Sequence, residues 1–326
     1  MMTKNSKVSV VIRCYNEEQH IGRLLNGIMH QTHRNLEIII VDSGSTDATL
    51  QIASKYPVHI LKIPKQEFSF GRSLNIGCSA ATGEYIVIAS AHVYPVYKDW
   101  IAKLVEPFSE PRVGLVYGKQ RGNEVTKYSE HRIFAQWFPL KAERPQGHPF
   151  CNNANAAIRR TLWEIMPYNE QLTGLEDIDW AKRVMQLGHT LVYEPSAEIV
   201  HVHNESWQQI CNRYRREAIA LKDIFPDHHF SWIHFVALLI SNSFSDYYHA
   251  LHDRALFKNL IAIPLFRLMQ FWGTYKGHQQ KVVLTEQLRQ ILYYPKKRLS
   301  RAEAMHLVAK QHASEKINYD QATASS

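Results

Sequence analysis

Three histidines follow runs of apolar residues that predict β-strands. His92 comes directly after the run at 84–90, and His201 and His203 end a later strand-like run. Because side chains alternate along a strand, His201 and His203 point to one face, and two imidazoles on one face suit a divalent metal ion. The ordinary alternative for each of them is a buried histidine with a backbone partner.

Polar and small residues also follow the other predicted strands. Asp42 ends the second strand, and its carboxylate is able to accept hydrogen bonds from a nucleobase or a ribose, or to close a turn with Gly44. Ligands of open parallel sheets bind beyond the carboxyl ends of the strands, which share one rim. The residues expected at this rim are Arg13, Asn16, Glu17, Asp42, Ser43, Ser90, Ala91 and His92.

Strand-like and helix-like segments alternate through the first half of the chain. Short connections in this order predict an α/β fold with a mostly parallel, doubly wound sheet. Residues 120–172 lose the pattern and predict irregular structure that shapes a pocket. From about residue 206 the pattern is helical, so we expect one domain over 1–205 and a helical, basic appendage over 206–326. The apolar runs that predict strands lie at 8–12, 36–42, 58–63, 84–90 and 113–118.

Composition excludes several classes of protein. Neither GxGxxG nor GxxxxGK[ST] occurs in the 326 residues, which argues against a dehydrogenase or a P-loop enzyme. Four dispersed cysteines without a CxxC pair fit a reducing compartment. No stretch reaches the roughly 20 apolar residues of a membrane span, whereas the runs at 232–240 and 259–266 fit either a membrane surface or a buried helix. We therefore expect a cytoplasmic protein, with peripheral attachment to the inner membrane face as an extension.

The formal net charge of +8 is concentrated near the end of the chain. Between Lys276 and Lys310, eight Lys/Arg face two Asp/Glu, which gives this segment +6. Such a segment predicts docking to an anionic membrane surface or to a protein, with a solvated helical face as the alternative. We expect no nucleic-acid partner.

The first fifty residues resemble a known enzyme family. The stretch "VSVVIRCYNEEQHIGRLLNGIMHQTHRNLEIIIVDSGSTDAT" is similar to the opening of family 2 glycosyltransferases, and "FSFGRSLNIGCSAATGEYIVIASA" continues the match. The resemblance covers roughly residues 7–205 and implies a GT-A fold that binds a nucleotide-sugar donor. "FSFGRSLN" and "SAHVYP" look most like the rhamnosyltransferase-like branch, which acts in bacterial surface polysaccharide assembly.

The resemblance also implies a nucleotide pocket for a UDP- or dTDP-sugar. Arg72 and Asn75 occupy the positions of an Arg/Asn pair near the base and the diphosphate in the family. The other residues expected to contact the donor are Arg13, Asn16, Glu17, Asp42, Ser43, Ser90 and Ala91.

His92 departs from the family pattern, which usually has an Asp-x-Asp signature after this strand. In one interpretation His92 and one of His201 or His203 bind Mn²⁺ or Mg²⁺, with the donor diphosphate supplying most ligands, and two imidazoles favour Mn²⁺. In a second, no metal binds, and His92, the histidine pair and Arg72 neutralise the diphosphate directly. In a third, His92 only packs. We rank the three interpretations in that order.

An acid pair begins the predicted helix at 174–188. In inverting members of the family, an Asp of such a pair is the base that removes the proton of the acceptor hydroxyl, which here implies Asp177 with Glu176 beside it. Residues 173–176 also match a capping box, which explains Glu176 but not Asp177. Asp179 is the second choice for the base.

Residues 145–160 supply amides that suit sugar hydroxyls, with capping of a loop as the alternative. We expect acceptor contacts from Asn152, Asn153, Asn155 and Trp180. Arg159 and Arg160 either meet phosphate or are solvated, and one arginine among Arg213, Arg215 and Arg216 is expected to touch the diphosphate.

Together these features predict an inverting hexosyl- or deoxyhexosyltransferase. It would move a sugar from a nucleoside-diphosphate donor to a hydroxyl of a glycan or a lipid-linked acceptor. The alternatives are a retaining GT-A glycosyltransferase, a metal-dependent hydrolase that uses His92, His201 and His203, and a nucleotide-binding module without turnover.

Overall fold

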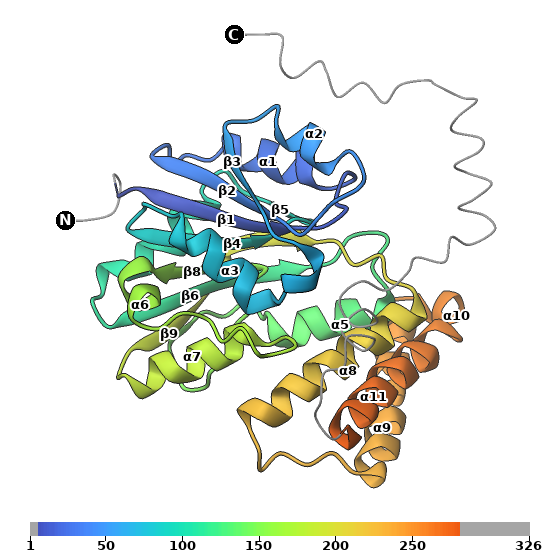
Figure 1. Ribbon diagram of the computed structural model, residues 1–326. Coiled ribbons are helices and arrows are strands. Elements are labelled where there is room, and N and C mark those ends of the chain that lie inside the picture. Colours follow the sequence, from blue (N-terminus) through green and yellow to red (C-terminus); the bar gives the residue numbers. More distant parts are fainter. Residues whose placement is uncertain (1–5, 281–326) are drawn as a thin grey trace, which may run out of the picture. The chain divides into compact units, whose positions relative to one another are not determined.

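A computed structural model describes residues 6–280 of the chain (Figure 1). Its first four long strands are the predicted apolar runs, and they pair in parallel in the order β3-β2-β1-β4. Their carboxyl ends therefore meet at one rim, as expected. These strands are β1 (Val8–Cys14), β2 (Leu36–Asp42), β3 (Val58–Lys62) and β4 (Tyr85–Ser90).

The other half of the sheet is mixed, which differs from the mostly parallel prediction. β8 runs antiparallel to β4 and β6, β6 and β9 are parallel, and β9 also pairs antiparallel with β5 and β7. The segment before β8 returns the chain to the rim, so β8 starts there and runs backwards. These strands are β5 (Val93–Pro95), β6 (Val113–Arg121), β7 (Glu143–Gln146), β8 (Asn155–Arg159) and β9 (Thr190–His201).

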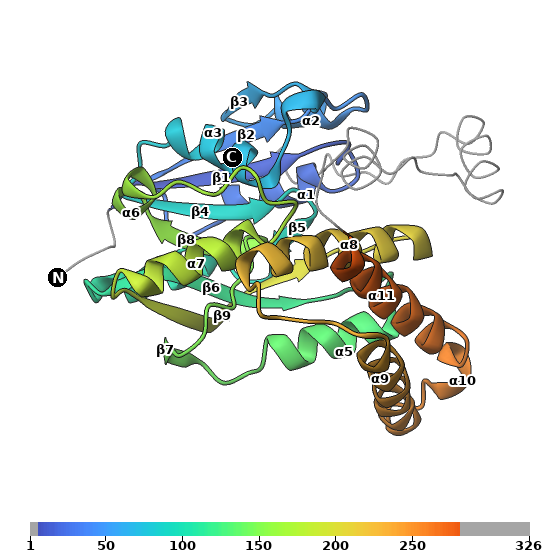
Figure 2. The ribbon, with the colours of Figure 1, turned by 60° about the horizontal axis from the view of Figure 1, so that its bottom comes forward.

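Different helices cover the two faces of the sheet (Figure 2). Helices α1 (Ile21–Met29), α2 (Thr49–Ala53) and α4 (Trp100–Val105) contribute to one hydrophobic core. Helices α3 (Phe70–Ser79), α6 (Arg160–Ile165) and α7 (Glu176–Gln186) contribute to the other. Neighbouring residues of β1 divide between the cores, because side chains alternate across a strand. Short 3-10 helices lie at Lys65–Glu67 and Glu106–Ser109.

The predicted irregular segment at 120–172 contains regular elements. Helix α5 (Tyr128–Trp137) lies within it, together with β7, β8 and α6. Its residue Phe134 joins the core that α3 and α7 share. The prediction of irregular structure was therefore wrong for these parts.

Helices fill the chain after β9, as the sequence indicates. α8 (Trp207–Ile224) packs along α11 (Ala262–Gln279), and α9 (Trp232–His252) and α10 (Leu256–Asn259) connect them. The close approach of α8 and α11 depends on Gly273 and Gly277, where a Cβ atom would meet backbone oxygens of α8 at 2.3 and 2.5 Å. The boundary predicted near residue 205 falls between β9 and α8 and stays a prediction.

Membrane crossing needs a long and continuously apolar helix. Among residues 6–280, no helix has that combination of length and hydropathy. Most of the basic segment between Lys276 and Lys310, and the docking predicted for it, lie outside the described residues.

Candidate functional site

The loops after β1 and β2 interlock at the rim. Asn16 has a positive φ of 54°, and its side-chain oxygen accepts a hydrogen bond from the Thr46 N–H at 2.8 Å. The backbone N–H of Asn16 donates to Ser45 Oγ at 2.9 Å, and that of Glu17 donates to Thr49 Oγ1 at 2.7 Å. These contacts fix two predicted donor-binding residues in a defined loop.

Asp42 is buried at the end of β2 and closes a turn. Its carboxylate accepts hydrogen bonds from the N–H groups of Gly44 at 3.0 Å and Ser45 at 3.1 Å, and from the Ser45 hydroxyl. The next residue, Ser43, donates its hydroxyl to the Cys14 carbonyl at 3.3 Å. The turn-closing role weighed for Asp42 is therefore present, and contact with a base stays a prediction.

Ser90 and Ala91 lie at the end of β4 but differ in exposure. Ser90 is half-buried and pairs in register with Arg13. The side chain of Ala91 is buried in a hydrophobic core, so a ligand at the rim would have only its backbone to contact.

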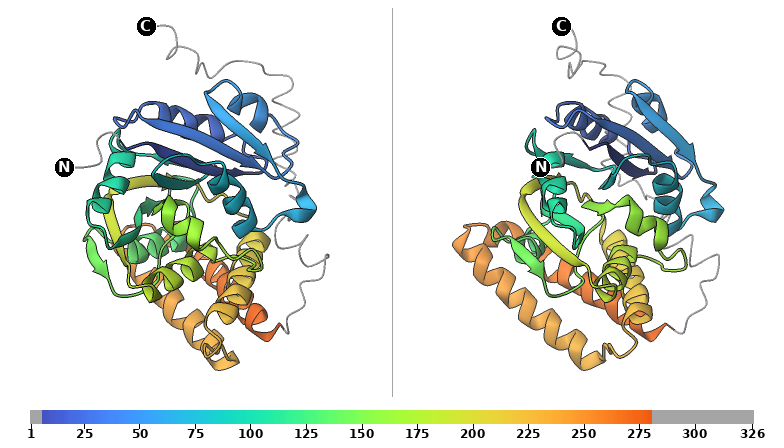
Figure 3. Two further views of the ribbon diagram at one scale, coloured as in Figure 1. Left: turned by 60° about the vertical axis from the view of Figure 1, so that its left-hand side comes forward. Right: turned by 90° about the vertical axis from the view of Figure 1, so that its left-hand side faces the viewer.

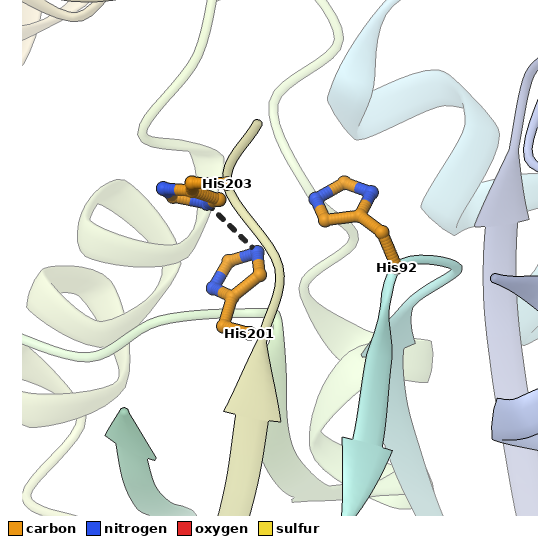
Figure 4. A group of neighbouring side chains, drawn as sticks. All are labelled: His92, His201 and His203. Atoms are coloured by element: carbon orange, nitrogen blue, oxygen red, sulfur yellow. Dashed lines mark hydrogen bonds between the residues drawn. The ribbon is translucent and has the colours of Figure 1, made fainter. Parts of the chain in front are cut away.

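The three histidines converge, as predicted from their places after strands (Figure 4). Antiparallel pairing of β5 with β9 places Val93 opposite His201, and the N–H of Val202 donates to the His92 carbonyl at 3.0 Å. The rings of His92 and His201 stack with centroids 5.0 Å apart. The Nε2 atoms of His201 and His203 are 3.0 Å apart. One nitrogen of each histidine lies within 4.8 Å of those of the other two.

Each of the three imidazoles is held from outside through Nδ1. The pairs are His92 with the Glu17 carboxylate (2.8 Å), His201 with the Gln120 side-chain oxygen (2.8 Å) and His203 with the Glu130 carboxylate (2.6 Å). With a proton on Nδ1 in these contacts, a neutral imidazole presents a lone pair at Nε2.

This arrangement fits a divalent cation. Two facing lone pairs on His201 and His203, 3.0 Å apart, repel each other unless a proton or a metal ion lies between them. Carboxylate and amide partners on Nδ1 are the outer contacts that orient metal-binding histidines. An all-imidazole set suits Mn²⁺ or another transition metal better than Mg²⁺, which prefers oxygen. The residues that would hold the ion are His92, His201 and His203.

The pKa values of His201 and His92 are shifted in opposite directions. Burial, reinforced by the neighbouring His203 and His92, holds the pKa of His201 well below its ordinary value. Burial also acts to lower the pKa of His92, but the Glu17 carboxylate outweighs it and raises that pKa above the ordinary value. The cluster therefore combines a neutral nitrogen donor with an imidazole that is readily protonated.

Glu130 and its contacts with His203 and Arg213 were not found from the sequence. This buried carboxylate binds Arg213 at 2.6 Å as well as His203, and Arg213 also pairs with Glu205 at 2.7 Å. Although burial acts to raise it, Arg213 and His203 lower the pKa of Glu130 strongly. The contacts join residues 73 and 83 positions apart, so no local pattern marks them. Arg213 thus pairs with carboxylates in the structure, and a diphosphate contact stays a prediction.

The acid pair lies at the same rim, beside Arg13 at the end of β1. Glu176 Oε1 accepts hydrogen bonds from Arg13 Nη1 at 3.0 Å and Asn153 Nδ2 at 3.3 Å. Asp177 accepts from the N–H of Asn153 at 3.0 Å and from that of Ile178 at 2.9 Å. Burial, followed by the neighbouring Glu176, raises the pKa of Asp177 to about 7. Asp177 is thus a buried carboxylate that gains and loses a proton near neutral pH.

The predicted capping box before this pair is absent. The residue that caps α7 is Leu175, with a positive φ of 54° and no side-chain hydrogen bond to the helix. The hydroxyl of Thr173 instead donates to the Arg216 carbonyl at 2.8 Å. Glu176 is therefore free of a capping role and faces Arg13.

Arginines gather around Phe70 at the start of α3. The guanidinium groups of Arg13 and Arg216 lie 4.9 and 4.5 Å from the centre of its ring. Arg72, expected near the diphosphate, forms an exposed ion pair with Glu67 at 2.6 Å. The donor contact of Arg72 stays a prediction.

Asn75 holds a loop, and its predicted contact with the donor stays a prediction. Its Nδ2 donates to the Tyr168 carbonyl and to Glu170, both at 2.9 Å. Its Oδ1 accepts from Trp163 Nε1 at 3.0 Å and from the Tyr168 N–H at 2.9 Å. All hydrogen-bonding groups of this amide are engaged within the fold.

Two of the predicted acceptor residues are also structural. Asn155 is fully buried and binds the Trp100 indole and the carbonyls of Lys119 and Ala197. Trp180 is fully buried as well, and its indole N–H donates to the Met166 carbonyl at 2.6 Å. Residue type suggested contact with a sugar, but burial removes both side chains from the rim.

The remaining predicted acceptor residues lie at the site. Asn152 accepts from the N–H of Ala154 at 2.9 Å, as a loop-capping amide does. Asn153 contacts both acids of the pair, and among the described residues its buried Oδ1 has no hydrogen-bond partner.

Arg159 and Arg160 lie at the opposite end of the sheet from this rim. Arg159 is in register with Tyr85 at the start of β4 and donates to the backbone carbonyls of Val113, Phe108 and Glu110. Of the two alternatives weighed for these arginines, their position argues against contact with a phosphate bound at the rim.

Comparisons with known proteins agree with the family resemblance of the sequence. The sequence model of Glycosyl transferase family 2 matches residues 9–166. The O-antigen chain rhamnosyltransferase WbaN of Salmonella anatum is 27% identical over 56% of this chain and 62% of its own length. The O-antigen chain rhamnosyltransferase RfbN of Salmonella typhimurium is 25% identical over 64% and 70%. The matched region thus spans about two thirds of these relatives.

Solved structures show the same fold. The mannosyltransferase PcManGT from Pyrobaculum calidifontis, in complex with GDP-Man and Mn²⁺, superimposes with a TM-score of 0.57 at 19% identity, over 90% of this chain and 88% of that one. GalNAc-T7 with UDP, GalNAc and Mn²⁺ gives 0.53 at 18% identity, over 67% and 48%. The fold is therefore GT-A, as the sequence resemblance implied.

Proposed function

We propose that this chain, which belongs to glycosyl transferase family 2 and has the GT-A fold, transfers a sugar from a nucleoside-diphosphate donor to an acceptor hydroxyl with inversion. The observation that carries the proposal is the environment of Asp177. It lies at the rim where ligands of such sheets bind, and its pKa of about 7 matches that of a general base near neutral pH.

Asp177 is proposed as the base. Its carboxylate removes the proton of the acceptor hydroxyl while the hydroxyl oxygen forms a bond to the anomeric carbon of the sugar. The bond from that carbon to the diphosphate oxygen breaks, and the nucleoside diphosphate leaves with the electron pair. Glu176 stays paired with Arg13 and disfavours a second charge on Asp177, which keeps its pKa high.

The donor is proposed to lie over the carboxyl ends of β1, β2 and β4. The interlocked loops present its candidate contacts, and UDP or dTDP is the proposed nucleotide. Arginine side chains near Phe70 supply positive charge beside the acids. The proposed donor contacts are Arg13, Asn16, Glu17, Asp42, Ser43, Arg72, Ser90 and the backbone of Ala91.

A divalent ion is proposed at His92, His201 and His203. When bound, it would supply positive charge that stabilises the leaving diphosphate. Its support is the facing pair of Nε2 atoms and the Mn²⁺ in the similar structures of PcManGT and GalNAc-T7. Without an ion, a protonated His92 held by Glu17 carries part of the same charge.

The sugar and the acceptor are proposed from the relatives. Because WbaN and RfbN are O-antigen chain rhamnosyltransferases by name, we infer a hexosyl or deoxyhexosyl donor and a glycan or lipid-linked acceptor of bacterial surface polysaccharide. The predicted cytoplasmic location, with peripheral attachment to the inner membrane face, belongs to this proposal.

The test combines donor binding with product analysis. Nucleotide sugars are screened by thermal shift with and without Mn²⁺, because a bound donor raises the melting temperature by mass action. With the stabilising donor, Asp177→Asn is expected to reduce transfer roughly 100- to 10,000-fold, the usual contribution of a general base. Asp179→Asn is the matched control, since Asp179 pairs with Arg183 on the same helix and should retain activity.

Full activity of a folded Asp177→Asn variant would remove the proposed base. The product also decides between reaction types. Retention at the anomeric carbon would assign a retaining transferase. The three-histidine cluster also fits a metal-dependent hydrolase, and release of free sugar with water as the sole acceptor would favour that second candidate.

A further inference from the structure

Helix α9 carries an apolar stripe that the other described residues leave exposed. Ile233, Ile240, Phe244, Tyr248 and Leu251 recur at helical spacing, and each is more than half exposed. At 1.5 Å per residue, the stripe is about 27 Å long. The opposite side of the helix packs inward through Phe235, Asp246 and Ala250, which are buried.

The stripe continues onto the neighbouring elements. Phe257 in α10 is 89% exposed, and Ile261 just before α11 is 80% exposed. An apolar pocket of about 440 Å³ lies between α9 and the start of α11, and its lining residues include Phe244 of α9 and Leu265 of α11. Figure 3 shows α9 at the edge of the described part, away from the sheet. We call the stripe together with Phe257 and Ile261 the α9 face.

The exposed charges of the segment from α9 to α11 are mostly positive. Asp246 is neutralised by buried Arg267 at 2.8 Å. The exposed ionic groups between residues 228 and 280 are then Arg254, Lys258 and Lys276 against the single acid Asp253. In the sequence, seven Lys/Arg and two Asp/Glu follow between 281 and 310.

We propose that the α9 face binds the surface of a lipid bilayer that contains anionic lipids. Large aromatic and aliphatic side chains on one side of a helix, with basic groups beside them, are the features of helices that lie in the plane of a membrane interface. The apolar side chains enter the acyl boundary, and the cations contact the anionic headgroups.

A second copy of the chain fits this face less well. A two-fold dimer through it would bring the same cations of both copies together. Protein interfaces also carry about one hydrogen bond per 100–200 Å², whereas the stripe offers one phenol and otherwise hydrocarbon side chains. The bilayer proposal does not depend on glycosyl transfer, so the two fail separately.

The test measures co-sedimentation of the full chain with vesicles. One set is phosphatidylcholine alone, and the other also contains phosphatidylglycerol. The parent is expected to sediment with the anionic vesicles and to be released by high salt. Phe244→Ser/Phe257→Ser/Ile261→Ser should weaken binding about tenfold or more, because each exposed apolar side chain removed lowers the partition.

The matched control replaces three exposed apolar residues outside the face, Leu140→Ser/Ile165→Ser/Leu187→Ser, and should bind as the parent does. Circular dichroism checks that both variants fold. The proposal is overturned if the parent ignores anionic vesicles at low salt, if it binds neutral vesicles equally, or if both triple variants behave alike. Light scattering that shows a dimer lost only in the α9-face variant, without vesicle binding, would assign the face to a second copy instead.

Discussion

At the carboxyl ends of the strands, buried Asp177 lies against Glu176, and its pKa rises to about 7. At the amino ends of β1 and β2, Glu37 lies among hydrogen-bond donors, and its pKa falls to about 2. The same chemical group is therefore tuned in opposite directions at the two ends of one sheet. The difference lies in the neighbours, because donors stabilise a carboxylate whereas burial and a like charge oppose ionisation.

The histidine cluster extends this contrast to cations. Burial and like-charged neighbours lower the pKa of His201 as they raise that of Asp177. Both groups are thus pushed toward the neutral form near pH 7. A neutral imidazole binds metal and a carboxylate with a pKa near 7 exchanges protons, so this end of the sheet is suited to chemistry.

Glu130 differs from Asp177, because its pKa is lowered although it lies at the same end of the sheet as the candidate site. We expect it to act as a positioning residue that orients His203. Glu130→Gln should lower the affinity for Mn²⁺ roughly 10- to 100-fold, the usual effect of losing an outer partner of a metal ligand. Isothermal titration calorimetry measures this without reference to activity.

Glu205→Gln is the control for this change, since Glu205 shares Arg213 with Glu130. The Glu205 carboxylate lies within 4.8 Å of the ligand atoms of Glu130 and His203, but Glu130 is the group that holds His203 Nδ1, so the Mn²⁺ affinity should fall less than in Glu130→Gln. Equal loss in the two variants would mean that the charge around Arg213, rather than the contact with His203, sets the affinity.

The dependence of kcat/KM on pH tests the raised pKa of Asp177. Asp177 acts as a base only when ionised, so kcat/KM should fall about tenfold for each pH unit below about 7. Donor affinity measured at the same pH values separates this loss from weaker binding. The residual activity of Asp177→Asn should lack this acidic limb, and a limb that persists there would assign the titration to another group.

The sequence predicted those parts of the fold and site that local pattern encodes. Mainly apolar runs identified β1 to β4, and the polar residues after them identified the rim. The acid pair was proposed from the family resemblance, and His201 and His203 because two residues spaced by two along a strand share one face. Backward-running β8 could not be found, since direction depends on the tertiary path of the chain rather than on periodicity.

Three of the predicted contact residues are engaged within the fold for one shared reason. Asn75, Asn155 and Trp180 carry polar groups that suit ligands, but in the structure those groups bind the chain itself. Glu130 was missed because the partners that give it a role, His203 and Arg213, lie far away in the sequence. Burial and long-range pairing decide between structural and functional use of a side chain, and neither is visible in a local pattern.

The smallest predicted effect belongs to the amino end of the sheet. Glu37 accepts hydrogen bonds from Ser9 and Thr82 and pairs with Lys7 at 2.8 Å. Although burial acts to raise its pKa, these contacts lower it from 4.5 to about 2. A carboxylate with a depressed pKa stabilises the fold fully above pH 4.5, and this stabilisation disappears as the pH falls toward 2.

Glu37→Gln should therefore cost about 0.5–1 kcal/mol of unfolding free energy near pH 7, because the ion pair is partly exposed and screened. Urea denaturation from pH 6 to pH 3 measures the difference, which should shrink as the pH falls. Transfer activity should match the parent, since this end of the sheet lies away from the rim. A loss of activity as large as that of Asp177→Asn would break the distinction between the two ends, because it would show that the donors around Glu37 serve the chemistry and not only the fold.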